Sequence, residues 1–221
     1  DKVTQDMTVA REEIFGPVMS VFTWDNYEAM IGHANELIYG LTAAIVTNDL
    51  GPVDLLVTNA GIARSTDNVT MTAEIWHEIM RTNLDGTFHQ VWRAKGGMIK
   101  RGYGRIVCIS SILGLMPNPI SVERQIAYGT SKAAIFGFVR NCAAAFGPHV
   151  RVNGVAPGFI DTDLTADVSE EARQSLIKST PLRRIGETAE VAELVDFLLS
   201  DKSSFTTGQT HVASGGMGTL P

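Results

Sequence analysis

The residues best able to do chemistry in this chain are a tyrosine and a lysine four positions apart, Tyr128 and Lys132. That spacing puts both side chains on one face of a helix, one turn apart. A neighbouring ammonium favours the phenolate, so we expect Lys132 to lower the pKa of Tyr128. Tyr128 is then a candidate general acid/base, and Ser111 a candidate hydroxyl for holding a substrate oxygen. Taken alone, the spacing fits a partly exposed helix pair equally well.

The elements that position these residues are predicted from short apolar runs, which indicate strands, alternating with amphipathic stretches, which indicate helices. Strands are predicted at residues 53–58, 105–110, 150–155 and 206–212. Helices are predicted at residues 72–93, 127–146, 169–180 and 188–200, with N-caps at Ser169 and Thr188. The apolar residues of the first helix are predicted to face the core: Ile75, Ile79, Met80, Leu84, Phe88 and Trp92. Prolines favour an extended, non-helical segment between residues 112 and 127. This alternation is typical of βα units around a parallel sheet.

Residues 1–50 do not continue the pattern cleanly. A strand at 18–22, a helix at 27–36 and a strand at 41–46 are predicted to form one βαβ unit. Only residues 47–52 separate its last strand from the strand at 53–58, whereas a parallel crossover needs roughly a dozen residues. Either these two strands are antiparallel neighbours, or one of the two strand predictions is wrong.

Composition excludes several classes of function. The 221 residues include 18 basic and 24 acidic side chains, which argues against a nucleic-acid-binding surface. No apolar run approaches the roughly 20 residues of a membrane span, and no apolar signal opens the chain, so we expect a cytoplasmic protein without membrane contact. Cys108 and Cys142 fit buried small apolar residues, and the five histidines are scattered, so no metal site is predicted.

Five groups of residues follow one another in a recognisable order. They are Thr58-Asn59-Ala60-Gly61, Asn83, Ser110-Ser111, Tyr128-x-x-x-Lys132 and Val155-Ala156-Pro157-Gly158-Phe159-Ile160-x-Thr162. Each has an ordinary explanation by itself: a turn, a strand end or a cap. Together they make residues 51–221 resemble the short-chain dehydrogenase/reductase family, closest to its 3-oxoacyl carrier-protein reductase branch. The resemblance implies a Rossmann-like, mostly parallel sheet flanked by helices.

The same resemblance implies an oxidoreductase that transfers a hydride between NAD or NADP and a small-molecule carbonyl/alcohol substrate. In such a protein Ser111 holds the carbonyl while Tyr128 gives it a proton. Lys132 lowers the pKa of Tyr128, and Asn83 holds a water that relays protons to Lys132.

The cofactor contacts that the resemblance implies fall on three segments. Asn59, Ala60 and Gly61 let the backbone approach the cofactor closely. Tyr128 and Lys132 contact its nicotinamide end, Lys132 at the ribose. Pro157, Gly158, Ile160 and Thr162 pass over the nicotinamide and contact its carboxamide. The segment between 112 and 127 forms one wall of the substrate site.

The family's oligomers imply a partner as well. A homodimer or homotetramer paired through helices 72–93 and 127–146 is expected, although their apolar density fits burial in the core equally well.

Upstream of Asp54 the pattern departs from the family. No Gly-x-x-x-Gly-x-Gly turn is present to bind the cofactor's pyrophosphate. Instead, Arg11 to Val18 and Tyr39 to Val46 resemble a catalytic-domain segment of aldehyde dehydrogenases, in which Glu13 and Phe15 would lie near the nicotinamide. The prediction is therefore a chimera: an aldehyde dehydrogenase-like βαβ segment at 1–50 replaces the first βα units of a short-chain dehydrogenase/reductase domain at 51–221. The alternative is a catalytically silent chimeric or truncated scaffold without a working dinucleotide site.

Overall fold

Residues 53–64, 71–117, 125–162, 165 and 168–218 are described by the computed structural model of the protein. The chain divides into two units, Asp1–Asn48 and Asp49–Pro221, and every described residue lies in the second. The strands and helix predicted within residues 1–50, and the antiparallel alternative for residues 41–58, fall outside the described residues.

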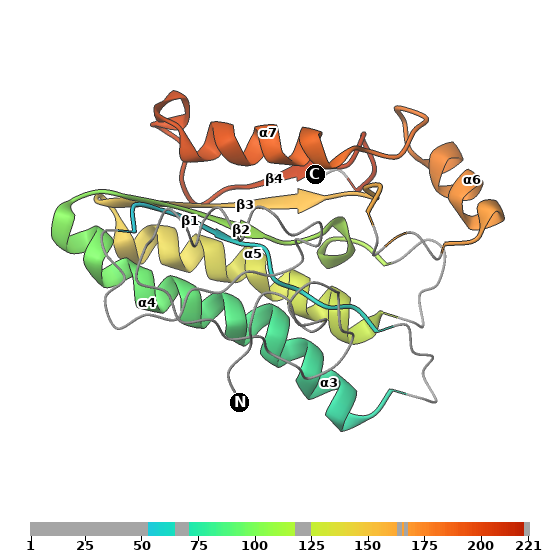
Figure 1. Cartoon of the computed structure of the whole chain (residues 1–221), viewed down its shortest axis with the longest axis horizontal. Coiled ribbons are helices and arrows are strands. Elements are labelled where there is room, and N and C mark those ends of the chain that lie inside the picture. Colours follow the sequence, from blue (N-terminus) through green and yellow to red (C-terminus); the bar gives the residue numbers. More distant parts are fainter. Residues whose placement is uncertain (1–52, 65–70, 118–124, 163–164, 166–167, 219–221) are drawn as a thin grey trace, which may run out of the picture. The chain divides into compact units, whose positions relative to one another are not determined.

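Within the described residues, four parallel strands form the sheet (Figure 1). They are β1 (Leu55–Thr58), β2 (Gly104–Ile109), β3 (Val150–Pro157) and β4 (Thr210–Ala213). Each strand pairs with the next in chain order, so the spatial order is β1-β2-β3-β4. The four predicted strands and their parallel arrangement are confirmed. The carboxyl ends of all four strands therefore lie along one edge of the sheet.

Helices cover both faces of this sheet. The described helical segments are α3 (Ala73–Met80), η1 (Arg81–Asp85), α4 (Gly86–Arg101), η2 (Ile112–Gly114), α5 (Ile126–Phe146), α6 (Glu170–Ser179), α7 (Thr188–Leu199) and η5 (Asp201–Ser203). Figure 1 shows α4 and α5 on one face and α7 on the other, with α6 beyond the carboxyl ends of the strands. The described residues thus form the predicted α/β fold with a parallel sheet.

The helix predicted at 72–93 differs from the observed one in two ways. It extends to Arg101, where Gly102 ends it in the left-handed conformation with φ of 73°. It also contains a π-helical turn, η1, between α3 and α4. Phe88 and Trp92 were expected in the core, but their side chains are exposed.

The π-turn explains the change of face. Because its hydrogen bonds span five residues instead of four, it holds more residues per turn than an α-helix. Residues four apart therefore stay on one side, and Ile79, Asn83, Thr87 and Val91 are the buried series. Leu84 still packs partly buried against the core, whereas Phe88 and Trp92, later in the expected series, are turned towards solvent.

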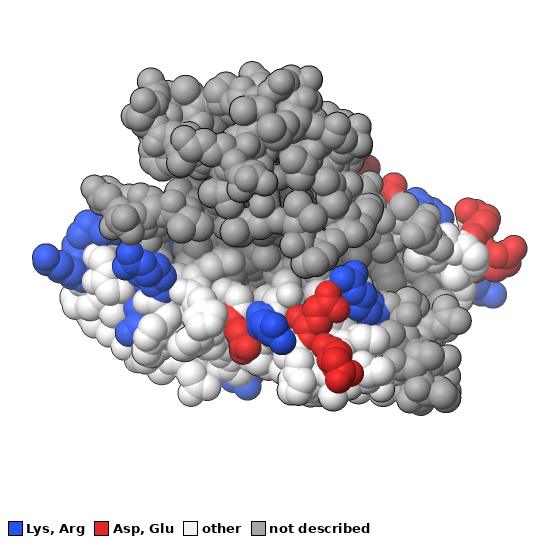
Figure 2. Space-filling view, turned by 60° about the horizontal axis from the view of Figure 1, so that its bottom comes forward, with Lys and Arg blue, Asp and Glu red and all other residues white. Residues whose placement is uncertain are grey.

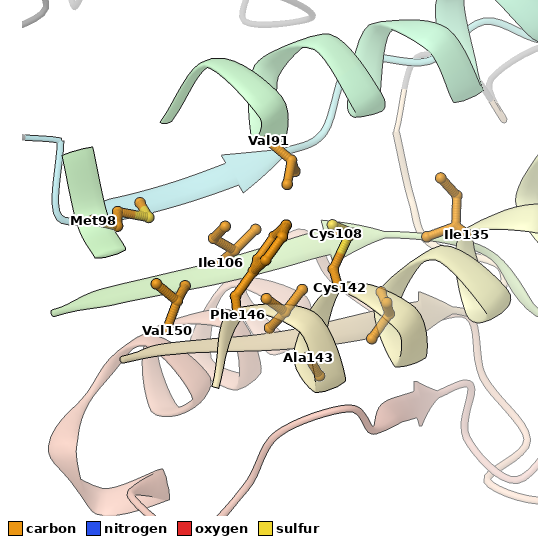
Figure 3. Close-up of a cluster of buried hydrophobic side chains, with 11 residues drawn as sticks. Val91, Met98, Ile106, Cys108, Ile135, Cys142, Ala143, Phe146 and Val150 are labelled. Atoms are coloured by element: carbon orange, nitrogen blue, oxygen red, sulfur yellow. The ribbon is translucent and has the colours of Figure 1, made fainter. Parts of the chain in front are cut away.

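The main core lies between α4, α5 and the sheet. Figure 3 shows Val91 and Met98 of α4 facing Ile106 and Cys108 of β2, with Cys142 and Phe146 on α5. Side chains that alternate with these face the other way, so Val107 packs with Val155 and Leu198 beneath α7. β2 and β3 are buried on both faces, which explains their continuous apolar runs. The prediction that both cysteines are buried is confirmed, and both are free.

Local capping separates the correct predictions from the incorrect ones. Ser169 caps α6 as predicted, since its Oγ accepts a hydrogen bond from Ala172 N at 3.3 Å. Thr188 is not the cap of α7. Glu187 takes that position in a reciprocal capping box, because the Glu190 carboxylate accepts from the Glu187 N–H at 2.8 Å.

The segment after Ser111 was predicted to be extended. It begins instead with the 3-10 turn η2, because the Ser111 Oγ accepts from Leu113 N at 3.1 Å and so caps a turn. Among the helices described, none combines the length and apolar character needed to cross a bilayer.

Candidate active site

The predicted site residues follow the carboxyl ends of the strands. Asn59, Ala60 and Gly61 come after β1, Ser111 after β2, and residues 158–162 after β3. Parallel strands place these segments along one edge of the sheet, where open α/β sheets bind their ligands. α5 adds Tyr128 and Lys132 beside that edge.

Lys132 is a buried lysine beneath Tyr128. Its Nζ donates a hydrogen bond to the Ile109 carbonyl at 2.9 Å and lies 5.7 Å from the centroid of the Tyr128 ring. Burial penalises the ammonium and lowers the pKa of Lys132 to about 8. The main chain is held as well, since Ser110 Oγ donates to the Lys132 carbonyl at 2.7 Å. Lys132 can therefore change its protonation state close to neutral pH.

The pKa of Tyr128 is shifted in the direction opposite to the expected one. Burial of the phenol raises its pKa, and a hydrogen bond with the Ser111 side chain offsets this only in part. The expectation that Lys132 lowers the Tyr128 pKa below its ordinary value is therefore wrong for this structure. The physical reason is that desolvation of the phenolate outweighs the favourable contacts. Tyr128 and Ser111 are nonetheless brought together as predicted.

Asn83 is fully buried in the π-turn. Its Oδ1 accepts from Ile62 N at 2.8 Å, and its Nδ2 donates to Ile62 O at 3.0 Å and to Ser131 Oγ at 3.0 Å. Thr87 Oγ1 donates to the Asn83 carbonyl at 2.9 Å. Both amide hydrogens thus have protein acceptors, so a relay water would have to bind an oxygen of Asn83. The water relay stays a prediction.

At Gly61 a side chain would make close contacts with neighbouring polar groups. A Cβ there would be 3.2 Å from Lys132 Nζ and 3.4 Å from Asn83 Oδ1. Glycine therefore allows the loop after β1 to approach both polar side chains. The cofactor-binding role of the Asn59-Ala60-Gly61 loop stays a prediction. Asn59 itself is exposed and Ala60 partly buried.

The loop after β3 is braced on two sides. At Gly158 a Cβ would be 2.7 Å from Ser214 Cα, and Gly158 N donates to Ala213 O at 2.8 Å. Ile160 pairs with Gly186 in a parallel bridge. Thr165 was not predicted as a site residue. Its Oγ1 joins two residues of this loop, because it donates a hydrogen bond to Ile160 O at 2.7 Å and accepts one from Thr162 N at 3.1 Å.

An apolar cluster borders Ser111. Buried Ile112, Leu176 and Met217 pack with partly buried side chains of the same region, namely Leu113, Met116, Phe159, Val168 and Val212. Next to it, a groove of about 380 Å³ runs between residues 113–117 and the start of α5. Sequence reasoning missed this cluster because its members come from four separate segments. The groove, which is lined mostly by apolar residues, can hold an apolar part of a substrate.

The described residues show what the site can hold. No three His, Cys, Asp or Glu side chains among them gather in a group that could bind a metal ion. The Gly61 approach, the Lys132 ammonium and the Ser111–Tyr128 pair fit the nicotinamide end of a dinucleotide next to a carbonyl.

Known proteins resemble this chain over most of its length. A family model described as "Enoyl-(Acyl carrier protein) reductase" matches residues 38–218. The 3-oxoacyl-[acyl-carrier-protein] reductase FabG of Aquifex aeolicus is 41% identical over 191 residues, which cover 86% of this chain and 72% of that protein.

Solved structures agree. A short chain dehydrogenase/reductase family protein has a TM-score of 0.69 and 33% identity, covering 76% of this chain and 68% of its own. A gluconate 5-dehydrogenase from Burkholderia cenocepacia, in complex with NADP and tartrate, has a TM-score of 0.73 and 31% identity, covering 78% and 67%.

Proposed function

Because the chain belongs to the short-chain dehydrogenase/reductase family, we propose that it reduces the 3-oxo group of an acyl chain carried as a thioester. Family membership makes it an oxidoreductase that transfers a hydride between NAD or NADP and a carbonyl/alcohol pair. The further step to a 3-oxoacyl substrate is supported by the Aquifex aeolicus relative, whose name states that substrate.

The observation that carries the proposal is the Ser111–Tyr128 pair at the border of an apolar cluster. The Ser111 side chain lies close enough to the Tyr128 phenol to lower its pKa, and the cluster begins at the next residue, Ile112. A 3-oxoacyl group needs a polar contact at its ketone and apolar contacts along its chain, and this arrangement offers both. A sugar acid such as gluconate would place hydroxyl groups against apolar side chains, which costs free energy unless each is hydrogen-bonded.

This geometry supports the following proposed residue roles. Ser111 Oγ donates a hydrogen bond to the ketone oxygen and orients it. Because burial raises the Tyr128 pKa, the phenol stays protonated at neutral pH and is suited to give its proton to the developing alkoxide. The dihydronicotinamide, when bound, supplies the hydride. Lys132 lies beneath the Tyr128 ring, where its positive charge stabilises the phenolate that remains.

The cofactor contacts belong to the same proposal. Asn59, Ala60 and Gly61 line one side of the dinucleotide, and Lys132 contacts its ribose. Pro157, Gly158, Ile160 and Thr162 bind the carboxamide end. Asn83 supports this arrangement by holding Ile62 through two hydrogen bonds.

Steady-state assays test the function. Acetoacetyl-CoA serves as a 3-oxoacyl thioester and 5-ketogluconate as the polar rival, each with NADPH and with NADH. We expect reduction of the thioester, and Tyr128→Phe should lower kcat by at least about a hundredfold with folding unchanged. Reduction of 5-ketogluconate alone would contradict the substrate assignment. The alternative of a silent scaffold predicts that calorimetry detects no binding of either dinucleotide.

We also propose that two copies pair through α4 and α5 as a homodimer. Trp92 is 52% exposed and stacks on Phe88 with ring centroids 5.2 Å apart, and Phe88 meets Phe138 of α5 edge-on. Exposed aromatic clusters mark interaction surfaces. A homotetramer, the other expected assembly, would need a second surface in addition to this one.

The distribution of charge along the continuous helix formed by α3, η1 and α4 supports antiparallel pairing of two copies. Acidic residues outnumber basic ones towards its start (Glu74, Glu78 and Asp85 against Arg81), and basic residues lie towards its end (Lys95, Lys100 and Arg101). Figure 2 shows Lys and Arg gathered at one end of this face, whereas Asp and Glu lie nearer the other end, interspersed with further Lys and Arg. A twofold axis places each acidic end against the partner's basic end.

The chimeric origin remains a separate proposal. We propose that an aldehyde dehydrogenase-like segment at 1–50 joins the reductase domain at 51–221, supported by the motifs from Arg11 to Val46. Two findings bear against a boundary at residue 50: the family model matches from residue 38, and the Aquifex aeolicus match covers 86% of the chain. Limited proteolysis with mass spectrometry tests it, because a joined segment predicts early cleavage near residues 48–52. Cleavage elsewhere first would oppose the proposal.

A cytoplasmic location is proposed as well. It is supported by Cys108 and Cys142, which are free and buried, as expected in a reducing compartment. Cell fractionation of the organism that makes the protein would test it.

A further inference from the structure

Ser131 is a buried serine inside the Tyr128–Lys132 turn to which the motif assigns no role. Its side chain is 0% exposed. Its Oγ accepts a hydrogen bond from Asn83 Nδ2 at 3.0 Å and donates one to the Tyr128 carbonyl at 2.7 Å. It therefore contacts both the π-turn and the main chain of the proposed proton donor.

The direction of each hydrogen bond in this chain is fixed by donor chemistry. The Ile62 N–H can only donate, so it must meet the Asn83 oxygen, and this leaves the Asn83 nitrogen facing Ile62 O and Ser131. Ser131 accepts from that nitrogen. Its single hydrogen then goes to the Tyr128 carbonyl, which can only accept. Each donor is used once, so the arrangement has no equally good alternative.

These bonds connect three elements that local structure does not connect. The helix α5 fixes Tyr128 relative to its own neighbours, but not relative to the loop after β1. Through Ser131, the Tyr128 main chain is tied to Asn83 in η1 and through Asn83 to Ile62. Resting on the proposed function, we propose that Ser131 is a positioning residue whose hydroxyl holds Tyr128 in register with Asn83 and the cofactor-binding loop.

Loss of the hydroxyl has a predictable effect. Ser131→Ala leaves one buried Asn83 N–H without an acceptor, which favours movement of the amide and loosening of Ile62. The turn that carries Tyr128 loses its lateral tie, and the phenol's hydrogen bond with Ser111 weakens. Since that bond lowers the Tyr128 pKa, its weakening raises the pKa further. Alanine is a strong helix former, so α5 itself should persist.

The decisive measurement does not depend on turnover. Tyrosines labelled with 13C at the ring are titrated by NMR in the whole protein, and Tyr128→Phe identifies the Tyr128 signal among the four tyrosines. We expect a higher Tyr128 pKa in Ser131→Ala than in the wild type. In parallel, kcat for acetoacetyl-CoA should fall about tenfold with a smaller change in KM. Ser131→Thr, which keeps the hydroxyl, should restore the wild-type pKa.

Ser203→Ala is the matched control. Ser203 is also buried, and its Oγ donates to the Leu198 carbonyl at 2.9 Å and accepts from Arg151 Nη1 at 2.9 Å. Ser203 lies in η5, where it contacts Arg151 near the amino end of β3, away from the site. The Ser203→Ala variant should lose about as much stability as Ser131→Ala, while its Tyr128 pKa and kcat stay as in the wild type.

An unchanged Tyr128 pKa in Ser131→Ala, or an equal shift in Ser203→Ala, would overturn the inference. If the wild type reduces no substrate, the proposed function fails, but the NMR titration still decides the role of Ser131.

Discussion

Burial dominates the chemistry of individual residues at this site. Desolvation raises the pKa of Tyr128 and lowers the pKa of Lys132 to about 8. Burial disfavours the charged form of each side chain, which is the phenolate of Tyr128 and the ammonium of Lys132. The spacing in the sequence correctly identified the pair. It could not give the direction of the Tyr128 pKa, since that depends on how much water the fold removes from the phenol.

Gly61 offers a test at this scale. In Gly61→Ala the new Cβ would press on Lys132 Nζ and Asn83 Oδ1, at 3.2 and 3.4 Å, and these atoms must move by a few tenths of an ångström. We expect kcat/KM to fall about tenfold while stability changes by less than about 1 kcal/mol. Steady-state kinetics and urea unfolding would measure the two effects.

Gly96→Ala provides the comparison. Nothing lies within 4 Å of a Cβ at Gly96, on the surface of α4. That substitution should stabilise the protein by roughly 0.5–1 kcal/mol and leave kinetics unchanged. Wild-type kinetics in Gly61→Ala would show that the close approach has no functional importance.

Elements determine which residues the site can use. The π-turn brings Asn83 into the interior and keeps Thr87 and Val91 on the same side. The position of the π-turn could not be predicted, because no particular residue type in the sequence indicates where hydrogen bonds that span five residues will form. By contrast, the four strands and the limits of α5 followed from short apolar runs and from Gly147. Ser131 escaped notice because its partner, Asn83, is 48 residues away in sequence.

Two arginines on neighbouring strands secure the end of α7. Arg151 donates from Nη1 to Ser203 O at 2.8 Å and from Nη2 to Ser200 O at 2.9 Å, and Arg105 Nη1 donates to Leu199 O at 2.7 Å. These guanidinium groups satisfy the carbonyls that a helix leaves free at its carboxyl end. The tie holds α7 against the sheet from the edge opposite the site.

Arg151→Met should therefore destabilise the protein by about 2 kcal/mol, because helix and turn carbonyls lose charged donors. The KM for acetoacetyl-CoA should not change. Urea unfolding followed by far-UV circular dichroism measures the first effect, and kinetics the second. An unaltered unfolding midpoint would mean that the arginine contacts contribute no net stability.

At the scale of the whole molecule, the exposed aromatic cluster of α4 predicts assembly. Trp92→Glu places a charge where a second copy would pack its own aromatic side chains, so a dimer should dissociate to monomers. Sedimentation velocity at several protein concentrations measures this, and Lys100→Gln, at the rim, should weaken pairing only slightly. A wild-type protein that is monomeric at every concentration would contradict the proposed interface.

The buried ammonium of Lys132 has a consequence for the heat of cofactor binding. A group with a pKa of about 8 is about half protonated at pH 8. The chain carries a formal net charge of −6, and a dinucleotide brings further negative charge. Its arrival should raise the Lys132 pKa, so that the complex takes up roughly half a proton from the buffer at pH 8. Calorimetry in phosphate and in Tris should then give different apparent enthalpies, and in Lys132→Met that difference should disappear.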